Sequence, residues 1–295
     1  MNFIKKIYKS LVYHDWEIAF PENTLEGVVK GEPLKVHIMK HSYHDRWFAD
    51  PFILDVTDSE IILLVEVVED RTQKGVIAKL NVDKSSYTLR SLKTILELPT
   101  HLSFPVIIRD GSRILVYPES GASGRLMMYE YNPSDDSMKP LYLVMNQYLA
   151  DAIMTDIFGK QLMFATLKGE ENGQDLTVYE SNGSNGWKRH SILHFEDKIA
   201  RMAGEFFKLD NKIYRPAQES NTIYGHGIVI QEMSLDGDKW NIKEVRRITS
   251  PSSRYDQATH TLNSYKGLVV IDVKGYRHYL IGKVLVGIKK LILRK

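Results

Sequence analysis

A degenerate repeat of about fifty residues runs along most of this chain and restricts its fold more than any other feature. The clearest copy is WFADPFIL, at Trp47–Leu54. Weaker copies begin near Leu102, Leu149, Met202 and Thr259. The intervals are 54, 47, 53 and 56 residues when the equivalent positions are Asp50, Phe104, Asp151, Gly204 and His260. A period of this length is typical of a propeller or a solenoid.

Each repeat is predicted to contain four short strands. Runs of β-branched, aliphatic and aromatic residues alternate with turns rich in Gly, Asn, Asp and Ser. The second strands are expected at Ile61–Val67, Arg113–Pro118, Gln161–Thr166, Lys212–Arg215 and Leu268–Val273. Four strands repeated around an axis form the blades of a β-propeller, so we predict an all-β fold with five blades. Leu34–His41 is expected to complete the short fifth blade; a solenoid is the less favoured alternative, because the repeats lack a helix.

Composition is that of an ordinary soluble globular protein. The 295 residues are 43% hydrophobic and 26% charged, and the net charge of +2 gives no reason to expect a nucleic-acid partner. The chain has no cysteine, which excludes disulfides, thiolate chemistry and cysteine-ligated metals. We expect no cofactor, although a divalent cation at the site is left open. Neither a secretory signal nor a run of about eighteen apolar residues is found, so we expect a cytoplasmic protein.

Both ends of the chain carry apolar residues at helical spacing with basic residues between them. The N-terminal stripe is Phe3, Ile4, Ile7, Tyr8 and Leu11, and the C-terminal stripe is Leu280, Ile281, Val284, Leu285, Ile288, Leu291 and Ile292. Such a helix can lie on an anionic membrane, or it can pack its stripe on the propeller. We therefore divide the chain into an N-terminal amphipathic segment (1–33, irregular from 13), a propeller (34–275) and a C-terminal basic helix (276–295).

Polar residues are expected to gather at one mouth of the propeller channel. First strands line the channel, so residues at their starts converge. Asp50, Asp151 and His260 hold this position in three blades, with Glu205 one residue beyond it in a fourth. Second strands end nearby and bring further polar residues: Glu66, Glu119, Arg215 and Gln218. Buried carboxylates are unfavourable unless they are paired or used. We predict a functional site here, although capping or ion-pair roles remain the alternative for Glu66, Glu119 and Glu205.

Paired carboxylates across a funnel suit glycoside chemistry, in which one acts as acid and the other as base or nucleophile. The candidate catalytic residues are Asp50, Asp151, Glu205 and Glu119. The candidate substrate-binding residues are Glu66, Ser103, Arg201, Arg215, Gln218, Tyr224 and His260. Aromatic side chains such as that of Tyr224 could stack on a sugar, although aromatics in such a protein more often belong to the core.

Several stretches resemble those of known propeller families. ADPF at 49–52 and ADA at 150–152 resemble strand starts in the five-bladed glycoside hydrolase family 43 clan. That resemblance implies that Asp50 is the general base and that Asp151 tunes the acid and orients the substrate. A closer resemblance, over most of residues 47–273, is to the N-terminal propeller of plant glucosamine inositolphosphorylceramide transferases and of bacterial polysaccharide-locus proteins. Its matching stretches are HLSFP (101–105), YPES (117–120), RMAG (201–204), YRPAQ (214–218), YG (224–225) and HTLN (260–263).

The chain departs from the hydrolase pattern in blade four. The resemblance implies Glu-Gly-Pro there, but Ala203 stands where the acidic residue belongs. Glu205, Glu119 or Glu66 could replace that acid. A transferase with an activated donor needs a base more than an acid, because a phosphate leaves without a proton. Arg201 and Arg215 could hold that phosphate.

Three functional hypotheses follow. The leading one is a glycosyltransferase-like enzyme of bacterial surface polysaccharide or glycolipid assembly, located on the inner membrane face. The alternatives are a hydrolase related to family 43 and a sugar-binding propeller without catalysis. The carbohydrate or activated sugar is the expected partner in each case, and turnover of an activated sugar separates the first hypothesis from the third.

Overall fold

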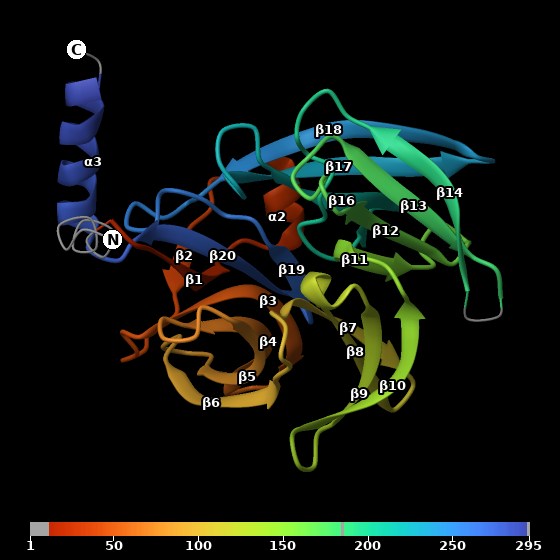
Figure 1. Ribbon diagram of the computed structural model, residues 1–295, viewed down its shortest axis with the longest axis horizontal. Coiled ribbons are helices and arrows are strands. Elements are labelled where there is room, and N and C mark those ends of the chain that lie inside the picture. The colour runs from red at the N-terminus through yellow and green to blue at the C-terminus, as the bar shows by residue number, and fades with distance from the viewer. Residues whose placement is uncertain (1–11, 184–185, 294–295) are drawn as a thin grey trace.

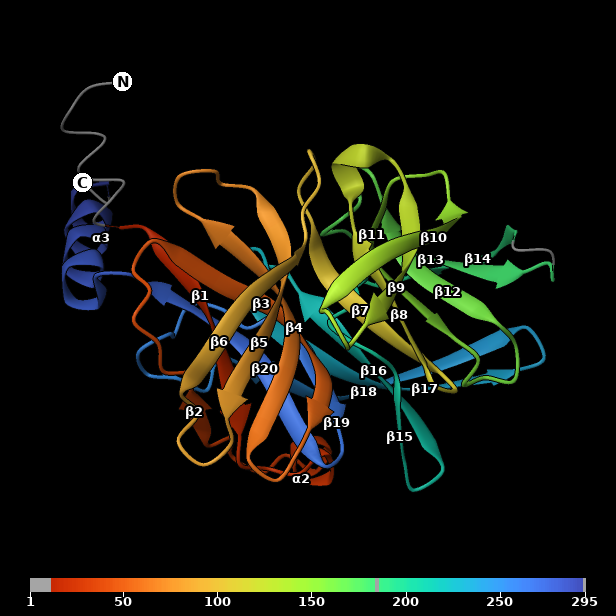
Figure 2. The ribbon, with the colours of Figure 1, turned by 90° about the horizontal axis from the view of Figure 1, so that it is seen from below.

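The computed structural model describes residues 12–183 and 186–293, and these form five four-stranded antiparallel sheets arranged around a central axis (Figures 1 and 2). Blade one contains β3 (Arg46–Val56), β4 (Glu60–Glu69), β5 (Gly75–Asp83) and β6 (Leu89–Leu96). Blade two contains β7 (Ser103–Asp110), β8 (Arg113–Glu119), β9 (Leu126–Asn132) and β10 (Ser137–Met145). Blade three contains β11 (Leu149–Thr155), β12 (Leu162–Leu167), β13 (Asp175–Ser181) and β14 (Trp187–His194). Blade four contains β15 (Phe207–Leu209), β16 (Lys212–Glu219), β17 (Gly227–Asp236) and β18 (Lys239–Thr249). The five-bladed propeller predicted from the repeat is confirmed.

Blade five joins the two ends of the chain. It combines β19 (Leu262–Tyr265) and β20 (Leu268–Tyr276) with β1 (His14–Pro21) and β2 (Val36–Ile38). The expected pairing of residues near 34–41 is thus confirmed. The expectation of an irregular segment at 13–33 is wrong, because β1 pairs with β20 from His14 to Ala19 and a helix, α2 (Leu25–Lys30), follows it. The sequence does not reveal β1, because the polar residues His14, Asp15 and Glu17 interrupt the apolar pattern of a strand whose buried run extends from Trp16 to Pro21.

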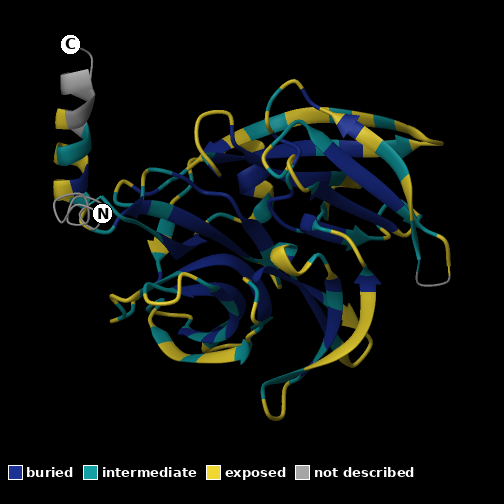
Figure 3. Cartoon of the chain, in the orientation of Figure 1, coloured by how far each residue is buried: buried dark blue, intermediate teal, exposed yellow. Residues whose placement is uncertain are grey.

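The apolar core lies between neighbouring blades, and the outermost strands are the most exposed (Figure 3). Phe52 of blade one meets Phe104 of blade two edge to face, with 5.0 Å between ring centroids. Between blades three and four, the rings of Phe164 and Phe206 pack at a tilt, with 4.7 Å between centroids. Inter-blade packing of this kind fixes the angle between sheets and therefore positions the residues that line the channel.

A C-terminal helix, α3 (Tyr279–Leu293), extends away from the propeller (Figure 1). Its first turns are tied to blade five, because Lys283 pairs with Asp256 and the Arg254 side chain donates to the carbonyls of Tyr276 and Arg277. No helix within the described residues is long and apolar enough to cross a membrane. The amphipathic helix expected at Phe3–Leu11 falls outside the described residues.

Blades one to three share a β-bulge near the start of the innermost strand. The register between first and second strands shifts after Ala49, Ser103 and Ala150. The residue that follows each of these has a positive φ: 51° at Asp50, 46° at Phe104 and 43° at Asp151. Positive φ is uncommon for residues other than glycine, although aspartate tolerates it better than most. The bulge re-aims these side chains, and it does so at the repeat positions identified from the sequence.

Candidate active site

The bulges are connected to one another through side chains of adjacent blades. The Asp50 amide donates to Asp272 Oδ2 at 3.1 Å, and the Phe104 amide donates to Asp50 Oδ2 at 3.1 Å. The Asp151 amide donates to Glu119 Oε2 at 2.9 Å. In blade four the Glu205 amide donates to Asn263 Oδ1 at 2.9 Å. The carboxylates at the mouth therefore hold the ring together as well as facing one another.

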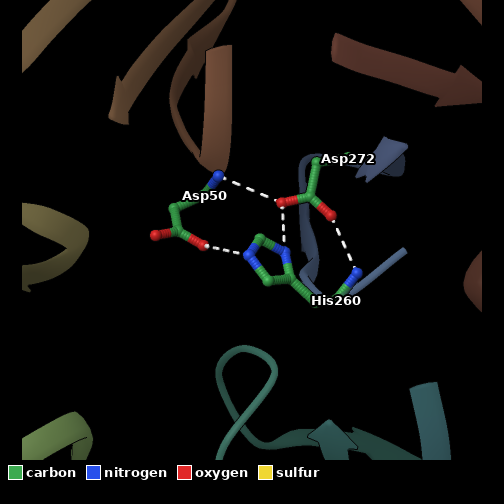
Figure 4. Close-up of side chains that lie close together, drawn as sticks. All are labelled: Asp50, His260 and Asp272. Carbon is green, nitrogen blue, oxygen red and sulfur yellow. Dashed lines mark hydrogen bonds and ion pairs between the residues drawn. The ribbon is translucent and has the colours of Figure 1, made fainter. Parts of the chain in front are cut away.

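Asp50, His260 and Asp272 form the first cluster (Figure 4). His260 Nδ1 lies 2.6 Å from Asp272 Oδ2, and its Nε2 lies 3.8 Å from Asp50 Oδ1. All three residues are almost fully buried. The Asp272 carboxylate thus orients the imidazole and directs its second nitrogen toward Asp50.

Burial raises the pKa of Asp50 to about 8, against the opposing influence of His260. Burial also acts on His260, but the Asp272 and Asp50 carboxylates outweigh it and hold the pKa of the imidazole above its ordinary value. Asp50 further accepts from the Thr261 hydroxyl at 2.8 Å. A carboxyl group with a pKa near the working pH is suited to proton transfer.

The same three residues offer ligand atoms that lie within 4.8 Å of one another, so they are the described group best placed for a cation. Asp272 Oδ2, however, accepts from His260 Nδ1 and the Asp50 amide, and its Oδ1 accepts from the amides of His260 and Thr261. An ion bound to Asp272 would have to displace some of these four interactions. The donor arrangement fits a histidine–carboxylate pair better than a metal centre.

Asp151, Arg201, Glu119 and Gln218 form the second cluster. Arg201 Nε lies 2.6 Å from Asp151 Oδ2, and its Nη2 lies 3.1 Å from Asp151 Oδ1 and 3.4 Å from Glu119 Oε2. The side-chain amide of Gln218 donates to Asp151 Oδ2 at 2.5 Å and to the Met202 carbonyl at 3.0 Å. Burial raises the pKa of Glu119 well above its usual range despite Arg201. Bidentate pairing commits the Arg201 guanidinium to Asp151.

One buried polar atom of this cluster has no partner among the described residues. It is Oε1 of Gln218, whose side chain is almost fully buried. Both acceptors around the amide nitrogen fix the orientation of the group, so the free atom is an acceptor. A water or a substrate hydroxyl is the kind of donor that would satisfy it.

Arg215 was predicted to face the channel and hold a phosphate, and that prediction is wrong. Its fully buried guanidinium donates to Gln231 Oε1 at 2.7 Å and to the carbonyls of Ile199, Ala200 and Arg201. Burial lowers its pKa to about 9. Arg215 shapes the loop that carries Arg201.

Three other predicted residues lie outside both clusters. Burial raises the pKa of Glu205 to about 7, and the charge that opposes this shift comes from Arg109, which donates to the carbonyls of Ile53 and Leu54 near the far end of β3. Glu66 pairs with His101 at 2.7 Å on the rim. Ser103 lies opposite Glu119 in the β7–β8 register. Ala203 is fully buried, so the place of the hydrolase acid is filled by packing.

An aromatic group lines the mouth beside His260. The ring of Trp16 stacks on His260 with 3.9 Å between centroids, and Tyr224 meets the same imidazole edge to face at 5.3 Å. Tyr224 is 38% exposed, whereas Asp50 is 4% and Asp151 1% exposed. The clusters therefore lie beneath a cover formed by Tyr224 and Arg201, rather than in the open funnel mouth expected from the sequence.

Asp272, Thr261, Asn263 and Trp16 were not predicted as site residues. Asp272 had a usable signal, since it is a lone carboxylate in the apolar run LVVIDV at 268–273. Trp16 could not be placed at the site, because it belongs to β1, which the sequence does not predict.

Comparison with known proteins gives distant relatives of one kind. A protein named glucosamine inositolphosphorylceramide transferase 1 from Arabidopsis thaliana is 26% identical over 231 residues, or 75% of this chain. The rice (Oryza sativa subsp. japonica) protein of that name is 24% identical over 226 residues, or 74% of this chain. The match spans 29% of the length of each relative.

Solved structures resemble the fold. The GH43_1 enzyme of Xanthomonas citri in complex with xylose superposes with a TM-score of 0.52 at 10% identity, covering 79% of this chain and 88% of that one. An exo-β-1,3-galactanase from Phanerochaete chrysosporium gives a TM-score of 0.53 at 8% identity, with coverages of 80% and 64%. At these identities the likeness shows the shared five-bladed fold.

The family described as "Glucosamine inositolphosphorylceramide transferase 1, N-terminal" matches residues 34–274. These residues include nearly all of the propeller and both carboxylate clusters, with Trp16 outside them. The chain therefore belongs to the family of glucosamine inositolphosphorylceramide transferase 1 N-terminal domains.

Proposed function

We propose that this chain is a carbohydrate-active enzyme of glycosyltransferase type that acts in assembly of a bacterial surface polysaccharide or glycolipid. The observation that carries the proposal is the recurrence of a buried aspartate on the bulges of blades one and three, with Asp50 directed toward the His260–Asp272 pair and Asp151 held by Arg201. Family membership favours transfer over hydrolysis.

In this proposal Asp50 accepts the proton of an acceptor hydroxyl as that oxygen forms its bond to the sugar of an activated donor. A phosphate leaving group departs without a proton, so no strong acid is needed, which agrees with Ala203 in blade four. Asp151 and Gln218 position sugar hydroxyls, and the unpartnered Gln218 Oε1 accepts from one of them. Arg215 takes no part in phosphate binding.

Turnover of sugar donors tests the proposal. Purified protein is incubated with UDP-glucose, UDP-N-acetylglucosamine and UDP-glucuronic acid in the presence of mono- and oligosaccharide acceptors, and separately with nitrophenyl glycosides, while nucleotide or nitrophenol release is followed. We expect nucleotide release that Asp50→Asn and Asp151→Asn abolish without loss of fold. Nitrophenol release alone would instead support the hydrolase alternative, and folded protein that consumes neither set contradicts an enzymatic role.

We further propose that α3 holds the protein on the surface of an anionic membrane, on its cytoplasmic side. Leu280, Ile281, Val284 and Ile288 are 74%, 48%, 59% and 49% exposed, an unusual density for one helix face. Lysines and an arginine follow in the sequence at 289, 290, 294 and 295. Because β20 ends at the same side as the start of β19, α3 begins at the mouth end of the propeller. A membrane bound by α3 would lie next to the mouth.

Vesicle sedimentation tests this placement. The full chain is expected to pellet with phosphatidylglycerol vesicles, to remain soluble with phosphatidylcholine vesicles, and to detach at high salt. The double substitution Ile281→Glu and Val284→Glu should abolish pelleting while leaving the melting temperature unchanged. A fall in melting temperature with retained pelleting would show that this face belongs to the folded core.

A further inference from the structure

A groove lies between blades two and three, away from both carboxylate clusters. It has a volume of about 550 Å³, within the usual range for small-molecule sites. Its walls come from the ends of β7 and β11 and from the outer strands β10 and β14. The bulges lie at the opposite ends of β7 and β11, so the groove opens toward the face of the propeller that lies away from the carboxylate clusters, the far face.

The lining combines flat apolar surface with free hydrogen-bonding groups. Tyr142 of β10 is 42% exposed, and Trp187 of β14 packs on the core but stays partly exposed. Met128 and Met154 supply further apolar surface. The exposed side chains of Asp156 and Gln161 make no hydrogen bond to any part of the chain that the structure describes.

We propose that this groove is a second carbohydrate-binding site that holds a stretch of neutral glycan without acting on it. Sugar rings present apolar C–H faces that stack on tyrosine and tryptophan, and hydroxyls that bond to carboxylates and amides. Arg109 on the wall is engaged with the Ile53 and Leu54 carbonyls and with the Tyr265 ring, at 3.6 Å from its centroid. Arg109 keeps its positive charge there, but the wall also carries the carboxylates of Asp110 and Asp156, so the lining is slightly acidic and disfavours anionic ligands such as nucleotides.

The inference rests on the groove's own chemistry and uses the proposed function only for the ligand class. A glycan held at the far face lies away from the proton-transfer residues. The groove would therefore hold one part of a polymer while the end of that polymer reacts at the carboxylate clusters. Such tethering raises the effective concentration of the reacting end.

Titration with defined trisaccharides tests the site. Xylotriose, β-1,3-galactotriose, maltotriose and chitotriose are titrated into the full chain by calorimetry, with saturation-transfer NMR as a second readout. At least one is expected to bind with a Kd on the order of 1 mM. Tyr142→Ala and Asp156→Ala should each weaken binding tenfold or more, and Tyr142→Phe should keep most of it, because the ring remains.

Two controls separate this site from the channel. Leu141→Ala removes a side chain that is 38% exposed on the same strand and outside the groove, and it should leave binding unchanged. Asp50→Asn should also leave it unchanged, even if all turnover is lost. The inference is overturned if none of the four trisaccharides binds, or if binding is lost in Asp50→Asn and kept in Tyr142→Ala.

Discussion

Asp50 and Asp151 occupy equivalent bulges, but their surroundings differ. Asp151 is clamped by Arg201 in a two-point ion pair and receives Gln218 as well. Asp50 meets a neutral hydroxyl, one backbone amide and an imidazole at 3.8 Å. A clamped carboxylate is suited to orient a ligand, whereas the less tightly held one can exchange a proton with it.

A pH profile of turnover examines the role of Asp50. A general base works only when ionised, and burial raises the pKa of Asp50 to about 8. Activity should therefore rise as the pH increases through about 8, and Asp50→Asn should lower the rate by about 10²–10⁴-fold. Initial rates between pH 5.5 and 9.5 give the profile. A rate that falls over that range would assign Asp50 the role of acid.

Arg215 allows a test in which stability is the readout. Replacing it with methionine leaves Gln231 and three loop carbonyls without their donor, although it also removes a buried charge. We expect Arg215→Met to lower the free energy of unfolding by about 2–4 kcal/mol, measured by urea denaturation. Arg125→Met, at an exposed position, should change it by less than about 0.5 kcal/mol. Equal effects of the two substitutions would contradict the role assigned to Arg215.

The sequence could reveal Asp50 and Asp151 because they recur at one position of the repeat. It could not reveal where the Arg215 side chain points. An arginine near the end of a strand gives the same sequence pattern whether its guanidinium faces the channel or an adjoining loop. The side chain is held by the backbone carbonyls of residues 199–201, and only the folded loop brings these carbonyls together around the guanidinium. The catalytic and binding roles given to the site residues, Glu205, Glu66 and Ser103 among them, remain predictions.

At the scale of elements, the bulged first strands organise the molecule. Blade four has the same feature in another form: Gly204 has a φ of 151°, and a Cβ built on it would lie 2.0 Å from the Leu262 carbonyl oxygen. Glycine is thus required by close approach of blade five. This explains why the aspartate of the repeat is replaced there, a point that the sequence alone left open.

Gly204→Ala should therefore be far more harmful than another glycine substitution. Gly111 also has a positive φ, of 60°, but a Cβ there would meet nothing within 4 Å. We expect Gly111→Ala to cost about 1–2 kcal/mol, from backbone conformation alone. Gly204→Ala should cost at least about 3 kcal/mol or prevent folding, because backbone has to move. Thermal and urea unfolding of both variants gives the comparison, and similar costs would argue against the tight blade four–five contact.

At the scale of the whole molecule, stability depends on closing the ring. Strand β1 inserts between β20 and β2 and buries Trp16, Ile18 and Phe20. The repeat predicted both the number of blades and the partner strand near residue 36. It did not predict β1, because polar residues interrupt the apolar pattern of that strand.

Truncation tests the closure. Removing residues 1–11 should leave the propeller folded, because β1 begins at His14. Removing residues 1–23 deletes β1, exposes the long edge of β20 and should yield aggregated protein. Adding a peptide of residues 12–23 during refolding should restore soluble protein by strand addition. A soluble, cooperatively unfolding product without that peptide would contradict the role of β1.

Ring closure also has a consequence for synthesis on the ribosome. Asp15 pairs with Gly275, so β1 has to wait for a partner that lies 260 residues later in the chain. Blades one to four can assemble in order as they emerge, whereas β1 remains without its main partner until β20 has been made. During that interval the apolar side chains of β1 are exposed, and they can meet another chain that is being made on the same messenger RNA. Slow translation is therefore expected to favour exchange of β1 between chains, giving dimers whose blades are all intact.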